Sequence, residues 1–130
     1  MKTSDVVRNF ENGSLYTILN KKELTNGEWN PHKKFAGVSL KNLAVSSDSG
    51  GRVSCHLVRV EPGCELSLHS HENNLEIHEV ISGSGTLKLG GNNYEYRSGS
   101  LSVIPDGAEH EVIAGPEGLY ILAKFIPALI

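Results

Sequence analysis

The sequence predicts an all-β sandwich or barrel formed by a single domain. From residue 35 onward, short segments rich in valine, isoleucine and leucine recur at near-regular spacing. Glycine, proline, asparagine, aspartate and serine separate these segments, and such residues form tight turns. No long segment shows the apolar spacing of an amphipathic helix. A chain of 130 residues can bury one hydrophobic core without disulfide bonds.

The first part of the chain has the weakest pattern. Val6, Val7 and Phe10 have the spacing of one amphipathic helical turn, and residues 15–19 could form a short strand. Beyond them, each predicted strand ends at a turn, of which Pro62-Gly63 is one of the sharpest. The predicted strands are residues 35–45, 52–60, 64–71, 76–82, 86–89, 94–97, 100–104, 110–114 and 119–126.

The composition argues against several classes of partner. The net charge is −3 and basic residues do not cluster, so the sequence predicts no nucleic-acid partner. No apolar run approaches the roughly 20 residues of a membrane-spanning helix, so no membrane partner is predicted. The first residues contain no apolar signal-peptide core, and we expect a cytoplasmic location. Cys55 and Cys64 are interpreted as small buried side chains rather than as a disulfide framework.

Three residues suggest a metal site. His69, His71 and Glu76 follow the spacing H-x-H-x4-E. Because alternate residues of a strand share a face, the two histidines project to the same side, and Glu76 can fold back opposite them. Two imidazoles with one carboxylate could hold zinc, iron, manganese, nickel or copper, with positions left open for water or substrate.

A second fragment could complete this site. The turn Pro105-Asp106-Gly107 precedes His110, which begins a predicted strand. If that strand pairs close to the first motif, His110 becomes a fourth ligand.

The two fragments together resemble the cupin family. The cupin motif G-x5-H-x-H-x3-4-E-x6-G matches Gly63, His69, His71, Glu76 and Gly83, and the second motif matches Gly99, Pro105, Gly107 and His110. Ala114 stands where the family often has asparagine, which affects the pocket lining rather than the ligands.

The resemblance implies a single-domain cupin β-barrel, a jelly roll or double-stranded β-helix, in residues 36–130. It implies that His69, His71, Glu76 and His110 bind one divalent ion of iron, manganese, nickel or zinc per chain. The alternative is a degenerate pocket that holds no metal. Small cupins are commonly homodimers, and residues 1–35 could form an N-terminal arm with short elements that is exchanged between partners.

His78 is a candidate catalytic residue because it shares the strand face of Glu76. In the pocket it could hydrogen-bond a substrate or carry a proton near neutral pH. The alternative is a buried histidine that is satisfied by a carboxylate such as Glu79 or Glu95.

Other polar residues have simpler interpretations. His56 could face inward, but we favour a rim or interface position. His32 is predicted to be a surface histidine. Lys124 could attract an anionic ligand, but we favour a side chain that extends to solvent at an edge. Tyr94 and Tyr96 share one strand face and are expected to supply packing.

The sequence thus predicts a metal-binding cupin with a small-molecule ligand. The first hypothesis is a metal-dependent enzyme of oxygenase, isomerase or lyase type acting on a small polar substrate. The alternative is a non-catalytic binding or sensing module, in which the metal only positions the ligand.

Overall fold

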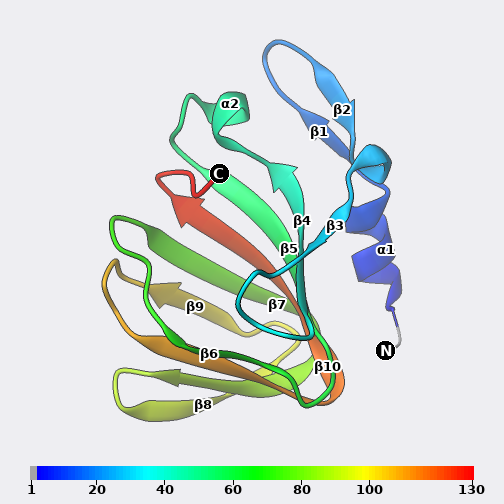
Figure 1. Ribbon diagram of the computed structural model, residues 1–130. Helices are drawn as coiled ribbons and strands as arrows, with labels where there is room; N and C mark the ends of the chain where they lie inside the picture. The colour runs from blue at the N-terminus through cyan, green and yellow to red at the C-terminus, as the bar shows by residue number, and fades with distance from the viewer. Residues whose placement is uncertain (1–2) are drawn as a thin grey trace.

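The computed structural model describes residues 3–130 and confirms the predicted all-β barrel. Its strands are β1 (Ser14–Tyr16), β2 (Lys21–Glu23), β3 (Trp29–Pro31), β4 (Val38–Ala44), β5 (Ser54–Val60), β6 (Glu65–His69), β7 (Leu75–Leu89), β8 (Asn92–Arg97), β9 (Leu101–Ile104) and β10 (His110–Ile126). Two short helices, α1 (Asp5–Glu11) and α2 (Ser46–Ser49), accompany a 3-10 turn, η1 (Leu24–Asn26). Figure 1 shows the strands folded into two layers that meet at one side and diverge toward the other.

The long strands β7 and β10 bend and contribute to both layers (Figure 1). The first half of β10 pairs with β6 and with the second half of β7. Its second half pairs with β5 and with the first half of β7. β9 and β8 pair with the first and second halves of β7 respectively, so they lie in opposite layers. The space between the layers is the interior of the barrel.

Two glycines allow β7 and β10 to cross closely at the bend. Gly83 has a φ of 87°, and a Cβ added there would lie 2.1 Å from the carbonyl oxygen of Gly118. A Cβ added at Gly85 would lie 2.4 Å from the carbonyl oxygen of Ile113. Because neither position has room for a side chain, only glycine lets the two strands approach this closely.

The main core fills the interior between the two layers. It consists of buried aliphatic and aromatic side chains: Val38, Val58, Val60, Val80, Leu87, Tyr96, Val112, Ala114, Leu119, Ile121, Ala123 and Phe125. A second cluster lies on the outer face of one layer, where Val7 of α1 packs with Leu57 and Tyr120. Ser4 caps α1 by accepting a hydrogen bond from the Val7 amide at 3.4 Å.

The strand boundaries differ from the prediction at the bends. The segments on either side of Gly83–Gly85 form the single strand β7, and those on either side of residues 115–118 form β10. The glycines bend the chain there without ending the strand. The segment between the predicted strands 35–45 and 52–60 contains α2, and Trp29–Pro31 forms an edge strand that the sequence did not predict.

The predicted arm of residues 1–35 includes residues 1 and 2, which lie outside the described residues. Within it, β1 and β2 form a separate hairpin, and Figure 1 shows this hairpin projecting from the barrel. Tyr16, Ile18 and Leu19 of the hairpin are exposed to solvent. Exchange of this arm between two copies of the chain stays a prediction.

Candidate metal centre

The four side chains predicted as metal ligands converge between the two layers. His69 ends β6, His71 follows it in the next loop, Glu76 lies at the start of β7 and His110 begins β10. β6 and β10 are antiparallel, with His69 directly opposite His110. One potential ligand atom from each of the four residues lies within 4.8 Å of the others. The fold therefore brings the two sequence motifs together.

Glu76 lies at the centre of this group. Its Oε1 atom is 3.1 Å from Nε2 of His110 and 3.7 Å from Nε2 of His71. The rings of His69 and His110 are 4.2 Å apart between centroids. Glu76 and His110 are buried, whereas His69 and His71 are half-buried. Three imidazoles thus surround one carboxylate oxygen.

Backbone hydrogen bonds orient two of the imidazoles. Nδ1 of His69 lies 2.7 Å from the carbonyl oxygen of Ser67, and Nδ1 of His110 lies 3.0 Å from that of Ala108. A carbonyl only accepts, so each Nδ1 carries the donated proton. In the neutral ring, Nε2 then keeps a free lone pair, which is the form that binds a metal.

The electrostatic environment keeps His69, His71 and Glu76 in the protonation states that bind a cation near neutral pH. Burial lowers the pKa of His69 to about 4 and also lowers the pKa of His71, so both are neutral at pH 7. Burial alone would raise the pKa of Glu76, but contacts with His110 and His78 outweigh it and hold that pKa well below its usual range. Burial likewise opposes protonation of His110, yet the adjacent Glu76 side chain raises its pKa overall.

The residues present fit a bound cation. Glu76 Oε1 and His110 Nε2 are both buried and make no hydrogen bond with any described residue, although they lie 3.1 Å apart. The contact between them has the distance of a hydrogen bond but not its alignment. Buried polar atoms left without partners are costly, and a cation between these two atoms would satisfy both. The donor set of three nitrogens and one oxygen suits a divalent transition metal.

His78 lies behind Glu76 and is almost fully buried. Its Nε2 is 2.8 Å from Oε2 of Glu76, and its Nδ1 is 2.9 Å from the hydroxyl of Tyr96. That hydroxyl is 2.8 Å from Oγ of Ser102. The carboxylate partner of His78 is therefore Glu76, while Glu79, one of the partners considered from sequence, pairs with Lys124. Tyr96, expected to supply packing, also holds His78.

A small cavity of about 60 Å³ lies beside the cluster. Its polar lining comes from His32, His69, His71, Glu76 and His78. Its apolar lining comes from Leu40, Val58, Leu66, Ile121, Ala123, Phe125 and Leu129. The volume accommodates a few water molecules or part of a small ligand.

The histidines outside the cluster correct two sequence predictions. His32, predicted at the surface, lines the cavity. His56, predicted at a rim or interface, has no exposed surface and binds Asn42 and Ser54, each at 2.8 Å. Asn42 lies on the neighbouring strand β4, so its contact with His56 depends on strand pairing, whereas Ser54 belongs to the same strand as His56.

Lys124 and the cysteines contribute nothing to the cavity lining. Lys124 forms an ion pair with Glu79 and is about one-third exposed, which agrees with a side chain that reaches solvent. Cys55 and Cys64 are free thiols, and burial raises the pKa of Cys55 to about 11. Among residues 3–130, no helix is long and apolar enough to span a membrane.

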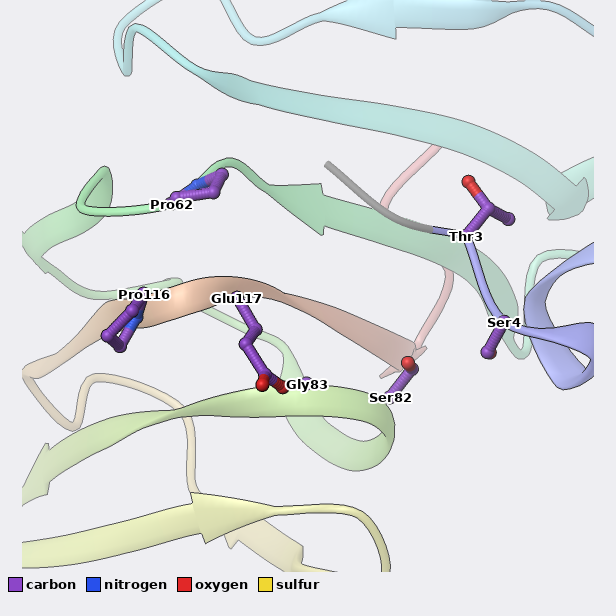
Figure 2. A pocket seen from close by; sticks show the side chains of 7 residues that line it. All are labelled: Thr3, Ser4, Pro62, Ser82, Gly83, Pro116 and Glu117. Atoms are coloured by element: carbon purple, nitrogen blue, oxygen red, sulfur yellow. The ribbon is translucent and has the colours of Figure 1, made fainter.

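A larger hollow lies at the bend of β7 and β10, away from the cluster. Figure 2 shows its lining, in which Gly83 and Glu117 come from the two long strands, and Thr3 and Ser4 from the segment before α1. The hollow has a volume of about 530 Å³ and contains none of the predicted ligands. Size alone therefore does not identify the functional site of this protein.

The profile of the cupin domain family matches residues 56–122. The chain belongs to the cupin family. The matched segment contains all four residues of the cluster. It begins at the middle of β5 and ends within β10, so it includes the strands that position the ligands.

A curated relative resembles about half of this cupin. Dimethylsulfoniopropionate lyase DddW from Ruegeria pomeroyi is 39% identical over 67 residues, which are 52% of this chain and 43% of the lyase. The chain thus matches less than half the length of that protein.

Solved structures share the fold at low sequence identity. A predicted oxalate decarboxylase from Thermotoga maritima has a TM-score of 0.70 at 22% identity, covering 78% of this chain and 91% of its own. KdgF from Halomonas sp. has a TM-score of 0.67 at 21% identity, covering 77% and 87%. Oxalate decarboxylase from Bacillus subtilis, described with Mn(II) centres, has a TM-score of 0.67 at 20% identity, covering 82% and 29%. These likenesses support the fold alone.

Proposed function

We propose that this cupin binds one divalent transition-metal ion through His69, His71, Glu76 and His110 and acts as a metal-dependent lyase. The observation that carries the proposal is the pair of buried, unpartnered atoms, Glu76 Oε1 and His110 Nε2, within a cluster of four potential ligands. Orientation of His69 and His110 by backbone carbonyls supports it, because such bonds fix the lone pairs toward one point.

The donor set limits the choice of ion. Three imidazoles and one carboxylate suit iron, manganese, nickel or zinc, and are too rich in nitrogen for a dedicated calcium or magnesium site. A bound ion would act as a Lewis acid that polarises a carbonyl or carboxylate oxygen of the substrate. The Mn(II) centres of a structural neighbour make manganese a useful first ion for reconstitution.

The surrounding residues would have separate tasks. Phe125, Ile121 and the other apolar side chains would limit the water around a bound ligand, which strengthens its polar contacts. His78 holds Oε2 of Glu76 and so leaves Oε1 directed toward His71 and His110. We also propose that His78 orients Glu76 and carries a proton during turnover.

The similarity to a lyase supports this reaction class over oxygenase and isomerase. Dimethylsulfoniopropionate is a small zwitterion with a carboxylate, so it fits the polar-substrate requirement and is the first substrate to test. Elimination would break one C–H bond and the C–S bond and form a C=C bond. The proton would pass to a base, and dimethyl sulfide would leave with the sulfonium electron pair.

The test combines metal analysis with turnover. Protein purified without added chelator is analysed for metal by mass spectrometry, then reconstituted separately with iron, manganese, nickel and zinc. Dimethyl sulfide is measured by headspace gas chromatography after addition of dimethylsulfoniopropionate. We expect about one ion per chain and metal-dependent release of dimethyl sulfide. One bound ion without release would limit the proposal to metal binding, and absence of a stoichiometric ion with every metal would refute it entirely.

A binding or sensing module is the second candidate function. The observation that favours it is that both ring nitrogens of His78 are engaged by neighbours, so proton transfer by this histidine would require one of these two contacts to break. In a binding module, small carboxylates would bind to the metal-loaded protein and be recovered unchanged. Product analysis after a long incubation separates the two functions.

A further inference from the structure

His32 lies outside the four-residue cluster but lines the same cavity. It directly follows β3, and its ring stacks on Phe35 with 4.7 Å between centroids. The Phe35 ring in turn lies 5.5 Å from the His69 ring. His32 is also close enough to His71 for its charge to contribute to the lowered pKa of that ligand. The side chain therefore belongs to the wall of the cavity.

The backbone fixes the hydrogen atom of the His32 ring. The amides of Lys34 and Phe35 both donate to Nδ1, at 3.0 and 3.3 Å. A nitrogen that accepts hydrogen bonds carries no proton, so the proton of the neutral ring lies on Nε2. Burial, reinforced by the charge of Lys34, lowers the pKa of His32 and favours this neutral form. Nε2 is thus a donor, and no described residue accepts its hydrogen bond.

The loop that carries His32 is held in place at several points. The His32 amide donates to the carbonyl of Val38 at 2.8 Å, which extends the pairing of β3 with β4. The Glu61 amide donates to the carbonyl of Gly37 at 2.9 Å. Gly37 has a φ of 77°, and a Cβ there would lie 2.4 Å from Sγ of Cys64. These contacts give the donor a defined position, as a binding residue requires.

We propose that His32 is a ligand-binding residue whose Nε2–H donates a hydrogen bond to a carboxylate oxygen of a small molecule held at the metal cluster. This inference rests on the proposed function, because the second carboxylate oxygen would be bound by the ion. A carboxylate offers two oxygens close together, which matches one cation and one neutral donor on a shared cavity. The apolar side chains around them would contact the short carbon chain of the ligand.

The test uses cobalt-reconstituted protein and acetate as the probe. Cobalt gives a visible spectrum that reports both metal binding and a change of ligands, so each titration yields a metal stoichiometry and an acetate Kd. In the variant His32→Asn, the side-chain oxygen can still accept hydrogen bonds from the backbone amides of Lys34 and Phe35. The Nε2–H donor of the histidine ring is lost. Lys33→Ala, at an exposed neighbouring position, is the matched control.

We expect His32→Asn to keep one cobalt per chain and to bind acetate about tenfold more weakly, as loss of a hydrogen bond to a charged group predicts. His32→Gln, which retains an N–H donor near the same place, should restore part of the affinity. Lys33→Ala should match the original protein.

Four results would overturn the inference. An acetate Kd that is equal in the original protein and His32→Asn would show that His32 does not touch the ligand. Loss of cobalt in His32→Asn would make His32 a metal ligand instead. A protein that binds cobalt but not acetate would refute the inference while leaving metal binding intact, whereas failure to bind cobalt would refute both proposals.

Discussion

Two buried histidines, His110 of the four-residue cluster and His56 outside it, have opposite hydrogen-bonding states. In the four-residue cluster, His110 has one nitrogen on a backbone carbonyl and the other without a partner. His56 has Nδ1 on Asn42 and Nε2 on Ser54, and the Ser54 hydroxyl also accepts from the Leu129 amide at 2.9 Å. Burial is similar in both places. The distinction lies in the unpartnered nitrogen, which indicates a ligand role, whereas full pairing indicates a structural one.

Loss of a cluster histidine should have the largest effect on metal binding. His110→Ala removes a ligand, so the decrease in metal affinity should exceed the roughly 10- to 100-fold that loss of an outer partner costs. The metal-free protein should also lose stability, because the variant leaves a cavity and removes a neighbour of the buried Glu76 carboxylate. Metal competition with a chromogenic chelator measures the first quantity and urea unfolding the second. Unchanged metal content in His110→Ala would contradict the ligand assignment.

His56→Ala should reduce stability alone. It leaves a cavity and removes the partners of Asn42 and Ser54, so the free energy of unfolding should fall by about 2–4 kcal/mol. The metal-to-protein ratio should stay the same in the folded protein. Urea unfolding and metal analysis of the same samples separate the effects. A large loss of metal with little loss of stability would instead assign His56 to the metal site.

His78 shares features with both His56 and the cluster histidines. Both of its nitrogens are paired, as in His56, yet it contacts Glu76, a predicted metal ligand. His78→Phe should retain one ion per chain at saturating metal, with about a tenfold weaker metal affinity as Glu76 loses its support. Turnover or ligand affinity should also change. Tyr96→Phe removes only the hydroxyl that contacts Nδ1 of His78, so it should reduce metal affinity less than His78→Phe does. If His78→Phe alters neither quantity, the residue contributes packing alone.

In the metal-free protein, His56 and the cluster residue His69 should both make the free energy of unfolding depend on pH. Burial lowers the pKa of His56 and lowers that of His69 to about 4, whereas an unfolded histidine titrates near 6.5. Between these values the unfolded chain binds more protons, so the free energy of unfolding should fall as pH falls from about 6.5 to 4. The raised pKa of His110 opposes this trend. Urea unfolding of metal-free protein across that range measures the slope, and a flat profile would contradict the assignment.

The sequence predicts the cluster better than its surroundings, for physical reasons. Strand alternation places His69 and His71 on one face. His110 joins them only through the pairing of β6 with β10, so the resemblance to the two cupin motifs, not local geometry alone, predicts all four residues. The contact that satisfies Nδ1 of His56 comes from Asn42, which belongs to another strand, so the spacing around His56 does not predict it. His32 was predicted at the surface because its neighbours are lysines, and its orientation comes from amides of its own turn.

The bends have a similar explanation. Glycine is a turn signal in sequence, so the sequence predicts that one strand ends before Gly83–Gly85 and another begins after it. In the structure, the missing side chains permit a close crossing, and backbone pairing resumes directly beyond it. A local pattern cannot distinguish a strand that ends from one that bends, because the difference depends on the partner strand.

The angle between the two layers at the crossing of Gly83 and Gly118 also affects the distances between residues of the distant cluster. Glu76 and His110 lie on opposite layers, seven and eight residues from this crossing, so each layer acts as an arm about 23–26 Å long. Rotation of one arm by about 3° would displace its end by about 1 Å, an error that can cost about 100-fold in rate when a reacting group is misplaced. The relative positions of Glu76 and His110 therefore depend on the crossing at Gly83 and Gly118, where neither strand has a side chain that could repack after a shift.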